Sequence, residues 1–286
     1  MTRKPRMQHL TTPAAPRPRR LWYVSCCGLL GLVAFAGADP ATPPPASAPS
    51  SSQPAAFTPA AAEGANPMDE PLRLLATARQ TVATVRDYSC TMIKREHLNG
   101  QMSPDNVIAM KVRKEPFSVY LRWVEPKAMV GQEVCYVAGK NDGKMRVKSP
   151  GLLGAVGFVS LDTNDERARK SSRHSITEAG IGNLLDRYQV GWDAERKLNL
   201  TQVRVGEYEY NKRRCSRVET VLRANPEGKF PYQRTVVYFD KESNLPIRVE
   251  CYDWPRRAGE AGEQVEVYNY VNLKLNVGLS DDVFNH

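Results

Sequence analysis

Histidine is the side chain best suited to moving protons near neutral pH, and this sequence holds few of them. Away from the chain ends there are two, His97 and His174. Catalysis by either would need a nucleophile and an orienting group around it, yet no GxSxG elbow and no Cys/His signature is present. His97 precedes a polar turn and His174 precedes an expected helix start. We therefore predict no catalytic residue and keep a hydrolase using His174 as the least favoured alternative.

Acidic residues from Asp162 to Glu166 are the candidates for a cation site. A calcium-binding EF-hand loop needs glycine at its sixth position and glutamate at its twelfth, where this chain has Arg167 and Arg173. The sequence also lacks the GxxxxGK[ST], GxGxxG and HExxH patterns of phosphate and zinc sites. It predicts neither a metal site nor a cofactor.

Cysteines are the remaining reactive side chains. Four of the six lie beyond residue 38, at Cys90, Cys135, Cys215 and Cys251, and their spacings are too wide for a CxxC motif. In an oxidising compartment they could form one or two disulfides, with three full pairings allowed. Each also lies in a strand-like stretch, so burial as a small apolar residue is the alternative.

The N-terminus has the pattern of an export signal. Six basic residues precede any acidic one, an apolar stretch runs from Leu21 to Ala36, and small residues follow before Asp39. Residues 1–38 are thus a predicted signal peptide, or a retained signal anchor, and Cys26 is only weakly like a lipidation site. Of the 40 Lys and Arg residues, 34 remain without these six, against 31 acidic residues. A net charge of about +3 gives nucleic-acid binding little support.

After residue 38 the composition changes twice. Residues 39–67 are rich in Ala, Pro and Ser, which predicts a solvated spacer without a core. Residues 68–286 form the expected folded domain, which opens with a helix over 68–86 whose apolar residues have helical spacing. About nine strands follow, because apolar residues alternate within segments bounded by turns such as Asn99-Gly100.

The middle of this domain differs from the rest. The stretch Pro150–Phe158 is apolar, rich in glycine and without a clean period, which indicates a loop or lid. Ser175 and Glu178 have the spacing of a capping box, so a second helix should follow them with Ile181, Leu184, Leu185 and Tyr188 on one side.

Several segments together resemble a family of bacterial exported domains of unknown function, related to the LolA-like outer-membrane lipoprotein-sorting proteins. They are Asp87–Thr91, Lys114–Trp123, Phe239–Arg248 and, typical of the narrower family, His174–Leu184. The resemblance covers roughly residues 70–286. It implies an α+β fold: a strongly curved antiparallel sheet, or half-barrel, with helices packed over its concave face and a space between them for acyl chains or hydrophobic peptides.

The resemblance also implies a function. We expect a non-enzymatic periplasmic or envelope protein that binds an acyl lipid or a lipoprotein without a cofactor. The alternative is an envelope interaction or stress-sensing module with a protein partner, held at the inner membrane if the signal is retained. The residues expected to line a cavity or form its lid are apolar: Phe117, Val119, Leu121, Trp123, Leu152, Leu153, Phe158, Ile181 and Leu184. Strand alternation places the first four on one face.

Overall fold

A computed structural model describes residues 65–257 and 259–286 of the chain. The predicted signal segment and almost all of the predicted spacer lie outside these residues, as does Cys26. Among the described residues, no helix is both long enough and apolar enough to cross a membrane.

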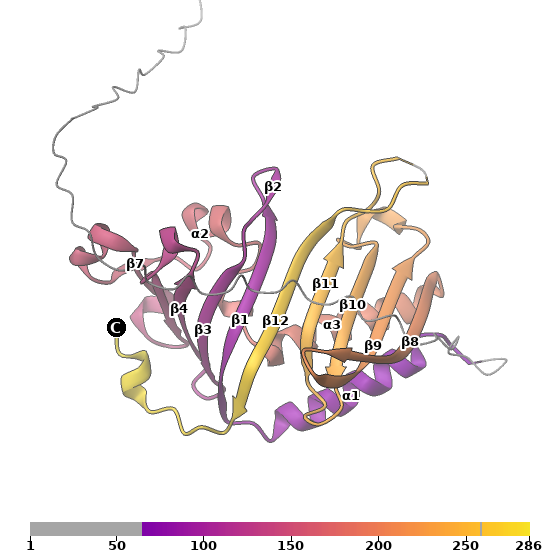
Figure 1. Ribbon diagram of the computed structural model, residues 1–286, viewed down its shortest axis with the longest axis horizontal. Helices are drawn as coiled ribbons and strands as arrows, with labels where there is room; N and C mark the ends of the chain where they lie inside the picture. The colour runs from indigo at the N-terminus through magenta and orange to yellow at the C-terminus, as the bar shows by residue number, and fades with distance from the viewer. Residues whose placement is uncertain (1–64, 258) are drawn as a thin grey trace, which may run out of the picture. The chain divides into compact units, whose positions relative to one another are not determined.

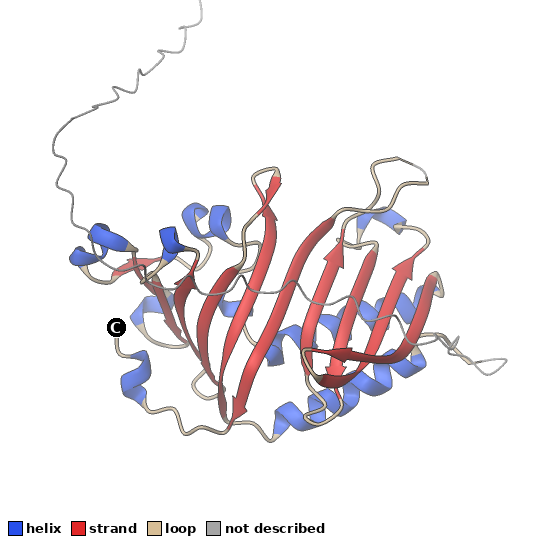
Figure 2. Cartoon of the chain, viewed as in Figure 1, coloured by secondary structure: helices blue, strands red, loops and turns tan. Residues whose placement is uncertain are grey.

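One antiparallel sheet with helices over one face forms the described part of the chain (Figure 1; Figure 2). Its twelve strands are β1 (Asp87–Leu98), β2 (Gln101–Met102), β3 (Asn106–Arg113), β4 (Ser118–Glu125), β5 (Glu133–Val137), β6 (Met145–Lys148), β7 (Val159–Leu161), β8 (Thr201–Tyr210), β9 (Arg213–Leu222), β10 (Arg234–Asp240), β11 (Pro246–Tyr252) and β12 (Gln264–Leu275). They neighbour one another in the order β7-β6-β5-β4-β3-β1-β12-β11-β10-β9-β8, and β2 pairs with β1. The edge strands β7 and β8 leave the curved sheet open.

The centre of the sheet is the pairing of the first long strand with the last. Strands β1 and β12 run antiparallel, with Met92 opposite Tyr270 and Glu96 opposite Glu266. This pairing joins two meanders, β1–β7 and β8–β12, which the chain connects through the helices. Residues from opposite ends of the domain therefore lie side by side at its middle.

Two longer helices, α1 (Asp69–Ala83) and α3 (Ile181–Leu198), cover the concave face and contact each other. Leu75 of α1 and Leu184, Leu185 and Trp192 of α3 belong to the same buried cluster as the sheet residue Met110. Apolar residues on one stripe of each helix explain this packing. The expected α+β architecture is confirmed.

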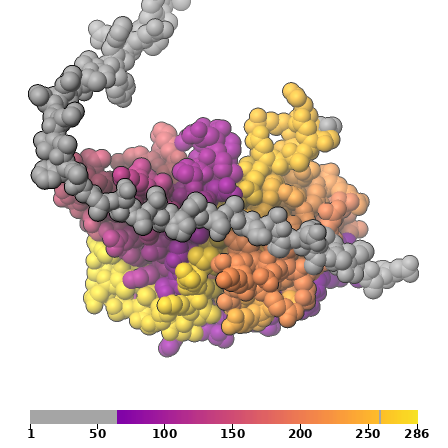
Figure 3. Space-filling view, viewed as in Figure 1, coloured from indigo at the N-terminus to yellow at the C-terminus, as the bar shows by residue number. Residues whose placement is uncertain are grey.

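The shorter helices lie in the connections, except that η6 follows the last strand: α2 (Glu166–Ser171), and the 3₁₀ turns η1 (Lys127–Met129), η2 (Asn141–Gly143), η3 (Gly151–Val156), η4 (Ile176–Glu178), η5 (Pro226–Gly228) and η6 (Asp281–Phe284). Asn99 and Gly100 have positive φ angles, as the predicted hairpin turn between β1 and β2 requires. This turn and the connection between β11 and β12 are two projections from one side of the molecule (Figure 3).

Three expectations need correction. The sheet has more than nine strands, because β2 is a two-residue extension of a hairpin and β7 forms just beyond the glycine-rich loop by pairing with β6. The prediction of a capping box is wrong: Ser175 caps only the short η4, and the Glu178 carboxylate binds His174 and Arg187 instead of the Ser175 backbone N–H. Helix α3 begins later, after Gly180, and of its predicted apolar side Ile181, Leu184 and Leu185 are buried and Tyr188 is half-buried.

The four cysteines of the domain are buried and free in the structure, so none of the three disulfide pairings is formed. Burial raises the pKa of the Cys90 thiol to about 12 and that of Cys135 to about 11. These thiols are packing residues without nucleophilic character near neutral pH.

Candidate functional site

A cavity of about 330 Å³ lies between the concave face of the sheet and the segment that follows β7. This volume falls at the lower end of the range of roughly 300–1,000 Å³ found for small-molecule sites. We call it the first cavity. Its apolar wall consists of Met92, Leu121, Trp123, Val134, Met145, Val147, Val159, Leu161, Ile176, Leu184 and Tyr270.

Residues 162–180, which we call the strap, cross the cavity and contain α2 and η4. The carboxylate of Asp165 accepts a hydrogen bond from the Arg167 backbone N–H at 2.9 Å and caps α2. The Ser175 hydroxyl donates to the Thr163 carbonyl at 3.2 Å. These local bonds fold the strap onto itself, so that it presents Ile176 to the cavity as a defined wall.

Gly180 ends the strap in a conformation that suits glycine. Its φ angle is +97°, and a Cβ atom there would lie 3.0 Å from the Tyr88 hydroxyl oxygen. That oxygen accepts the Ile181 backbone N–H at 2.8 Å, which satisfies one free donor at the start of α3. The close approach of backbone to Tyr88 fixes where α3 starts, and with it the position of Leu184 over the cavity.

A buried carboxylate, Glu266 on β12, holds the strap to the sheet. It accepts hydrogen bonds from Arg173 Nε at 2.6 Å and Tyr232 Oη at 2.6 Å, and lies 3.1 Å from His174 Nε2. Burial opposes ionisation of Glu266, but the hydrogen bonds and the positive charge of His174 outweigh it and lower its pKa. Glu266 is thus an ionised anchor for two strap residues.

A second buried carboxylate, Glu96 on β1, contributes to the same wall. Lys94 Nζ lies 2.9 Å from Glu96 and 3.1 Å from the Ser172 hydroxyl, and the Tyr268 hydroxyl also donates to Glu96. Both members of the Lys94–Glu96 pair are less than a tenth exposed. Because burying charges costs more than most ion pairs return, this pair is better explained by a role at the site than by stability.

His174 lies between two carboxylates, with Nδ1 3.2 Å from Glu178 and Nε2 3.1 Å from Glu266. Burial alone would lower its pKa, but the hydrogen bond and charge of Glu266 outweigh burial, so its pKa is raised. Within the described residues neither ring nitrogen contacts a serine, threonine or cysteine. The arrangement that a His174-dependent hydrolase would need is not formed here.

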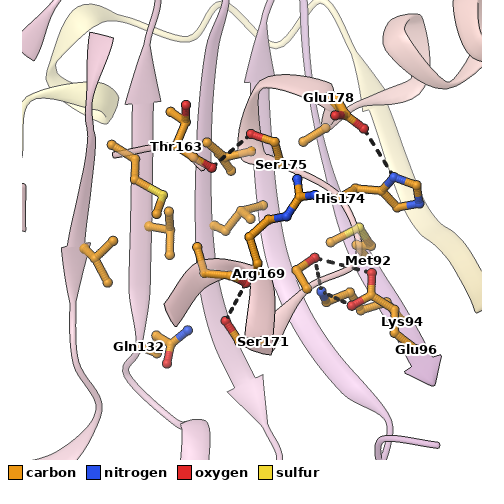
Figure 4. Close-up of a pocket in the computed structure, with 18 of the residues that line it drawn as sticks. Met92, Lys94, Glu96, Gln132, Thr163, Arg169, Ser171, His174, Ser175 and Glu178 are labelled. Atoms are coloured by element: carbon orange, nitrogen blue, oxygen red, sulfur yellow. Dashed lines mark hydrogen bonds and ion pairs between the residues drawn. The ribbon is translucent and has the colours of Figure 1, made fainter. Parts of the chain in front are cut away.

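Two further hollows adjoin the first cavity, part of whose lining Figure 4 shows. The second cavity, about 300 Å³, runs beneath α3 and shares His174, Leu184, Arg187 and Tyr268 with the first. The polar hollow, about 350 Å³, is lined by His97, Leu98, Asn99, Arg169, Ser172, Arg173, His174, Tyr232 and Glu266. An apolar space therefore opens directly beside a polar one.

Three of the sequence-predicted residues, Leu121, Trp123 and Leu184, line the first cavity. Val119 lies on the same face of β4 but is completely buried within the core. The Trp123 indole N–H donates to Asn106 at 3.0 Å, which fixes the ring against the wall. The structure thus brings part of the predicted set together at one place.

The other predicted residues lie elsewhere. Phe117 and Ile181 line a different hollow, of about 540 Å³, beside α1. Leu152 and Leu153, in η3, are 95% and 73% exposed and are not among the residues that line the four hollows. The Phe158 ring stacks on His286 with ring centroids 4.7 Å apart. A lid role for these residues stays a prediction.

Sequence reasoning missed the polar part of the site. The signal was present in β1, where Met92, Lys94 and Glu96 occupy alternate positions and so share one face. Charged residues on the buried face of a strand are unusual, because Lys and Glu are rarely buried unless they are paired, and so they single out this face. Within residues 65–257 and 259–286, no three His, Cys, Asp or Glu side chains are grouped to hold a metal ion.

The fold and site define an α+β protein built on one open antiparallel sheet, with an apolar cavity beneath a strap on its concave face. The chain belongs to the family described as "Protein of unknown function (DUF1571)", whose model matches residues 85–286. This confirms the expected membership of an uncharacterised family. No protein in the comparison with curated proteins matches the sequence.

Several solved structures are similar in chain path. A DUF1329 family protein from Desulfovibrio piger has 15% identity and a TM-score of 0.40, covering 78% of this chain and 98% of its own. A LolA superfamily protein from Nitrosomonas europaea has 12% identity and a TM-score of 0.33, covering 75% and 97%. Lipoprotein LppX from Mycobacterium tuberculosis has 12% identity and a TM-score of 0.41, covering 73% and 98%. At such identities, function has to be argued from this chain's own residues.

Proposed function

We propose that the protein is a non-enzymatic binder of acyl lipid or lipidated protein in the bacterial envelope, and that the first cavity holds the acyl chain. The observation that carries the proposal is the cavity itself: about 330 Å³, walled mostly by aliphatic and aromatic side chains, between a sheet and a strap. The predicted export segment supports the compartment, and retention of that segment would hold the protein at the inner membrane.

Burial of apolar surface supplies the binding energy in this proposal. Each methylene of an acyl chain that leaves water contributes about 0.8 kcal/mol. Several buried methylenes are needed, because association and ordering of the chain cost free energy. Met92 and Met145 suit such a ligand, since the unbranched thioether side chain adapts to the shape of a flexible chain.

Native mass spectrometry of the full chain purified from a bacterial envelope tests the proposal first. We expect added mass that organic extraction identifies as a lipid or an acylated peptide. Purified protein should also take up a fluorescent fatty acid. A protein that carries no lipid and takes up no fatty acid would remove the first cavity as an acyl site.

A matched pair of variants locates the binding. Val147 is half-buried and lines the first cavity, so Val147→Trp should fill it and reduce fatty-acid uptake by at least about tenfold. Val124, 50% exposed and not a cavity residue, is the control, and Val124→Trp should leave uptake unchanged. Equal uptake by both folded variants would place the ligand elsewhere.

An interaction module with a protein partner is the second candidate function. The observation in its favour is η3, where Leu152, Leu153 and Val156 are 95%, 73% and 77% exposed. Neighbouring exposed apolar residues often mark contact surfaces. Photo-crosslinking from position 153 in cells should then capture one partner, and a Leu152→Ser/Leu153→Ser variant should lose it while keeping fatty-acid uptake.

A further inference from the structure

Arg169, in the middle of α2, lies at the boundary between the first cavity and the polar hollow. It lines both spaces, together with Ser172 and His174. Figure 4 shows its side chain extending from α2 across the pocket, toward the part of the strap that carries Ser175 and His174. Within the described residues its guanidinium makes no hydrogen bond and no ion pair, and the residue is exposed.

The carboxylates around Arg169 are already engaged. Glu96 is bound by Lys94 and Tyr268, Glu266 by Arg173 and His174. Glu178, the third carboxylate of these two spaces, lies 3.2 Å from His174 and 3.8 Å from Arg187. Each acidic group thus has its own donors, which leaves the positive charge of Arg169 uncompensated at the opening.

Neighbouring cations at the cavity differ from Arg169 in this respect. Arg167 is bound to Asp165 through two nitrogen atoms, and Lys94 is buried against Glu96. Arg187 donates to the Glu178 carbonyl at 2.9 Å. Arg169 is therefore the cation at this opening that can bind an incoming anion without first giving up a partner.

We infer that the ligand is a single-chain anionic amphiphile, whose carboxylate or phosphate head group binds Arg169 in the polar hollow while its acyl chain occupies the first cavity. The inference rests on the proposed function and adds the chemical class of the ligand. Apolar and polar spaces that share a wall match the two ends of such a molecule. A guanidinium suits the head group because it can donate two parallel hydrogen bonds to a carboxylate or a phosphate.

The test compares two ligands with the same chain on the full, delipidated protein by calorimetry. Palmitate carries a carboxylate, whereas monopalmitoylglycerol is neutral. We expect palmitate to bind about tenfold more tightly than monopalmitoylglycerol, as a charge-assisted hydrogen bond would produce. In Arg169→Gln this preference should disappear while affinity for the neutral ligand is kept.

Lys170→Gln is the matched control. Lys170 is the next residue of the same helix, exposed and bound to Glu166 at 2.7 Å, and it does not line either space. It should keep the full preference for palmitate. A preference that survives in Arg169→Gln, or one that is lost equally in Lys170→Gln, would overturn the role of Arg169.

The remaining outcomes separate this inference from the proposed function. Equal binding of palmitate and monopalmitoylglycerol by the unmodified protein would refute the anionic head group and leave acyl binding standing. Binding of neither would refute both. Binding of palmitoyl-glycerol-3-phosphate with the same dependence on Arg169 would support a phosphate head group as well as a carboxylate. Displacement of palmitate by inorganic phosphate alone would instead assign Arg169 to a free ion and overturn the amphiphile.

Discussion

Glu96 and Glu266 stand directly opposite each other in the β1–β12 ladder, both with side chains about 2% exposed. Like charges in this position repel each other, and burial strengthens the repulsion. The structure compensates each one with separate donors, Lys94 and Tyr268 for Glu96, and Arg173 and Tyr232 for Glu266. The strap supplies Arg173 and Ser172, so its position over the cavity depends on this carboxylate pair.

The Lys94–Glu96 pair gives the first prediction. Glu96→Gln leaves the Lys94 ammonium buried without a counter-charge and should destabilise the protein by about 3–5 kcal/mol. Replacing both, as Lys94→Met with Glu96→Gln, removes the unpaired charge and should cost clearly less. Urea denaturation of the two variants measures the difference.

Glu70→Gln is the control for that comparison. Glu70 binds Arg73 on the exposed surface of α1, and surface pairs contribute at most about 1 kcal/mol. If the double replacement is as unstable as Glu96→Gln, the cost lies in lost packing and our account of the pair is wrong.

The contact between His174 and Glu266 predicts a pH dependence of the strap. Glu266 raises the pKa of His174 above its ordinary 6.5, so this contribution to stability is fully present below about pH 6.5 and is lost as pH rises through the folded pKa. The pKa of Glu266 is lowered from 4.5, so its contribution is present above about pH 4.5 and is lost as pH falls through the folded pKa. The contact between His174 and Glu266 therefore stabilises the protein most between about pH 4.5 and pH 6.5.

Thermal unfolding of the protein and of His174→Gln across pH 5 to 9 measures this dependence. The unmodified protein should lose part of its stability as pH rises through the folded pKa of His174, and the variant should lack that step. His97→Gln is the control, because His97 also lines the polar hollow and, among the residues that the structure describes, makes no ion pair with a carboxylate. The same step in His174→Gln would assign the titration to another group.

Much of the sheet could be predicted because strands such as β1 and β3 alternate between buried and less buried residues. Alternation in Ile108, Met110 and Val112 identifies β3, and positive φ angles at Asn99 and Gly100 follow from the residue types. Strand β7 could not be predicted from the sequence, because a strand of three residues is too short to show alternation. Val159–Leu161 forms a strand by pairing with β6, which only the tertiary structure shows. The 3₁₀ turn at Ile176–Glu178 has a cap like that of an α-helix, which explains the misplaced helix start.

The site was less predictable than the fold because it depends on register. Alternation in β4 places Leu121 and Trp123 on one face, and both line the first cavity. The neighbours of Glu266, by contrast, come from the strap and from Tyr232, and only the tertiary structure brings them together. The exposure of Leu152 could not be deduced either, because an apolar glycine-rich segment suits a lid and a surface loop equally.

The conformation of Gly180 before α3 gives the third prediction, which concerns the free energy of unfolding. Gly180→Ala forces an L-residue to a φ of +97° and brings its Cβ to 3.0 Å from the Tyr88 oxygen, so we expect a loss of about 1–3 kcal/mol in unfolding free energy. Gly191→Ala is the matched control within α3, where a Cβ meets nothing within 4 Å and alanine should stabilise by up to about 1 kcal/mol. Chemical denaturation of both variants should give opposite signs, and equal losses would contradict the strain at Gly180.

Glu195, in α3, gives the last prediction. It lines the second cavity, is 6% exposed and has the Thr201 hydroxyl as its hydrogen-bond donor at 3.0 Å. Burial raises its pKa from 4.5 to about 7, so the folded protein holds a proton that the unfolded chain releases. Its contribution to stability is therefore full below about pH 4.5 and is lost as pH rises to about 7.

Glu195→Gln keeps the shape of the neutral acid and cannot ionise. At pH 8 the variant should be more stable than the unmodified protein, by an amount on the order of 1–3 kcal/mol, while at pH 4.5 the two should be nearly equal. Asp193→Asn, two residues earlier in the same helix, is the control for the loss of a carboxylate that Gln189 rather than Thr201 binds. Denaturation at the two pH values decides: parallel curves for Glu195→Gln and the unmodified protein would contradict a pKa of Glu195 that burial raises.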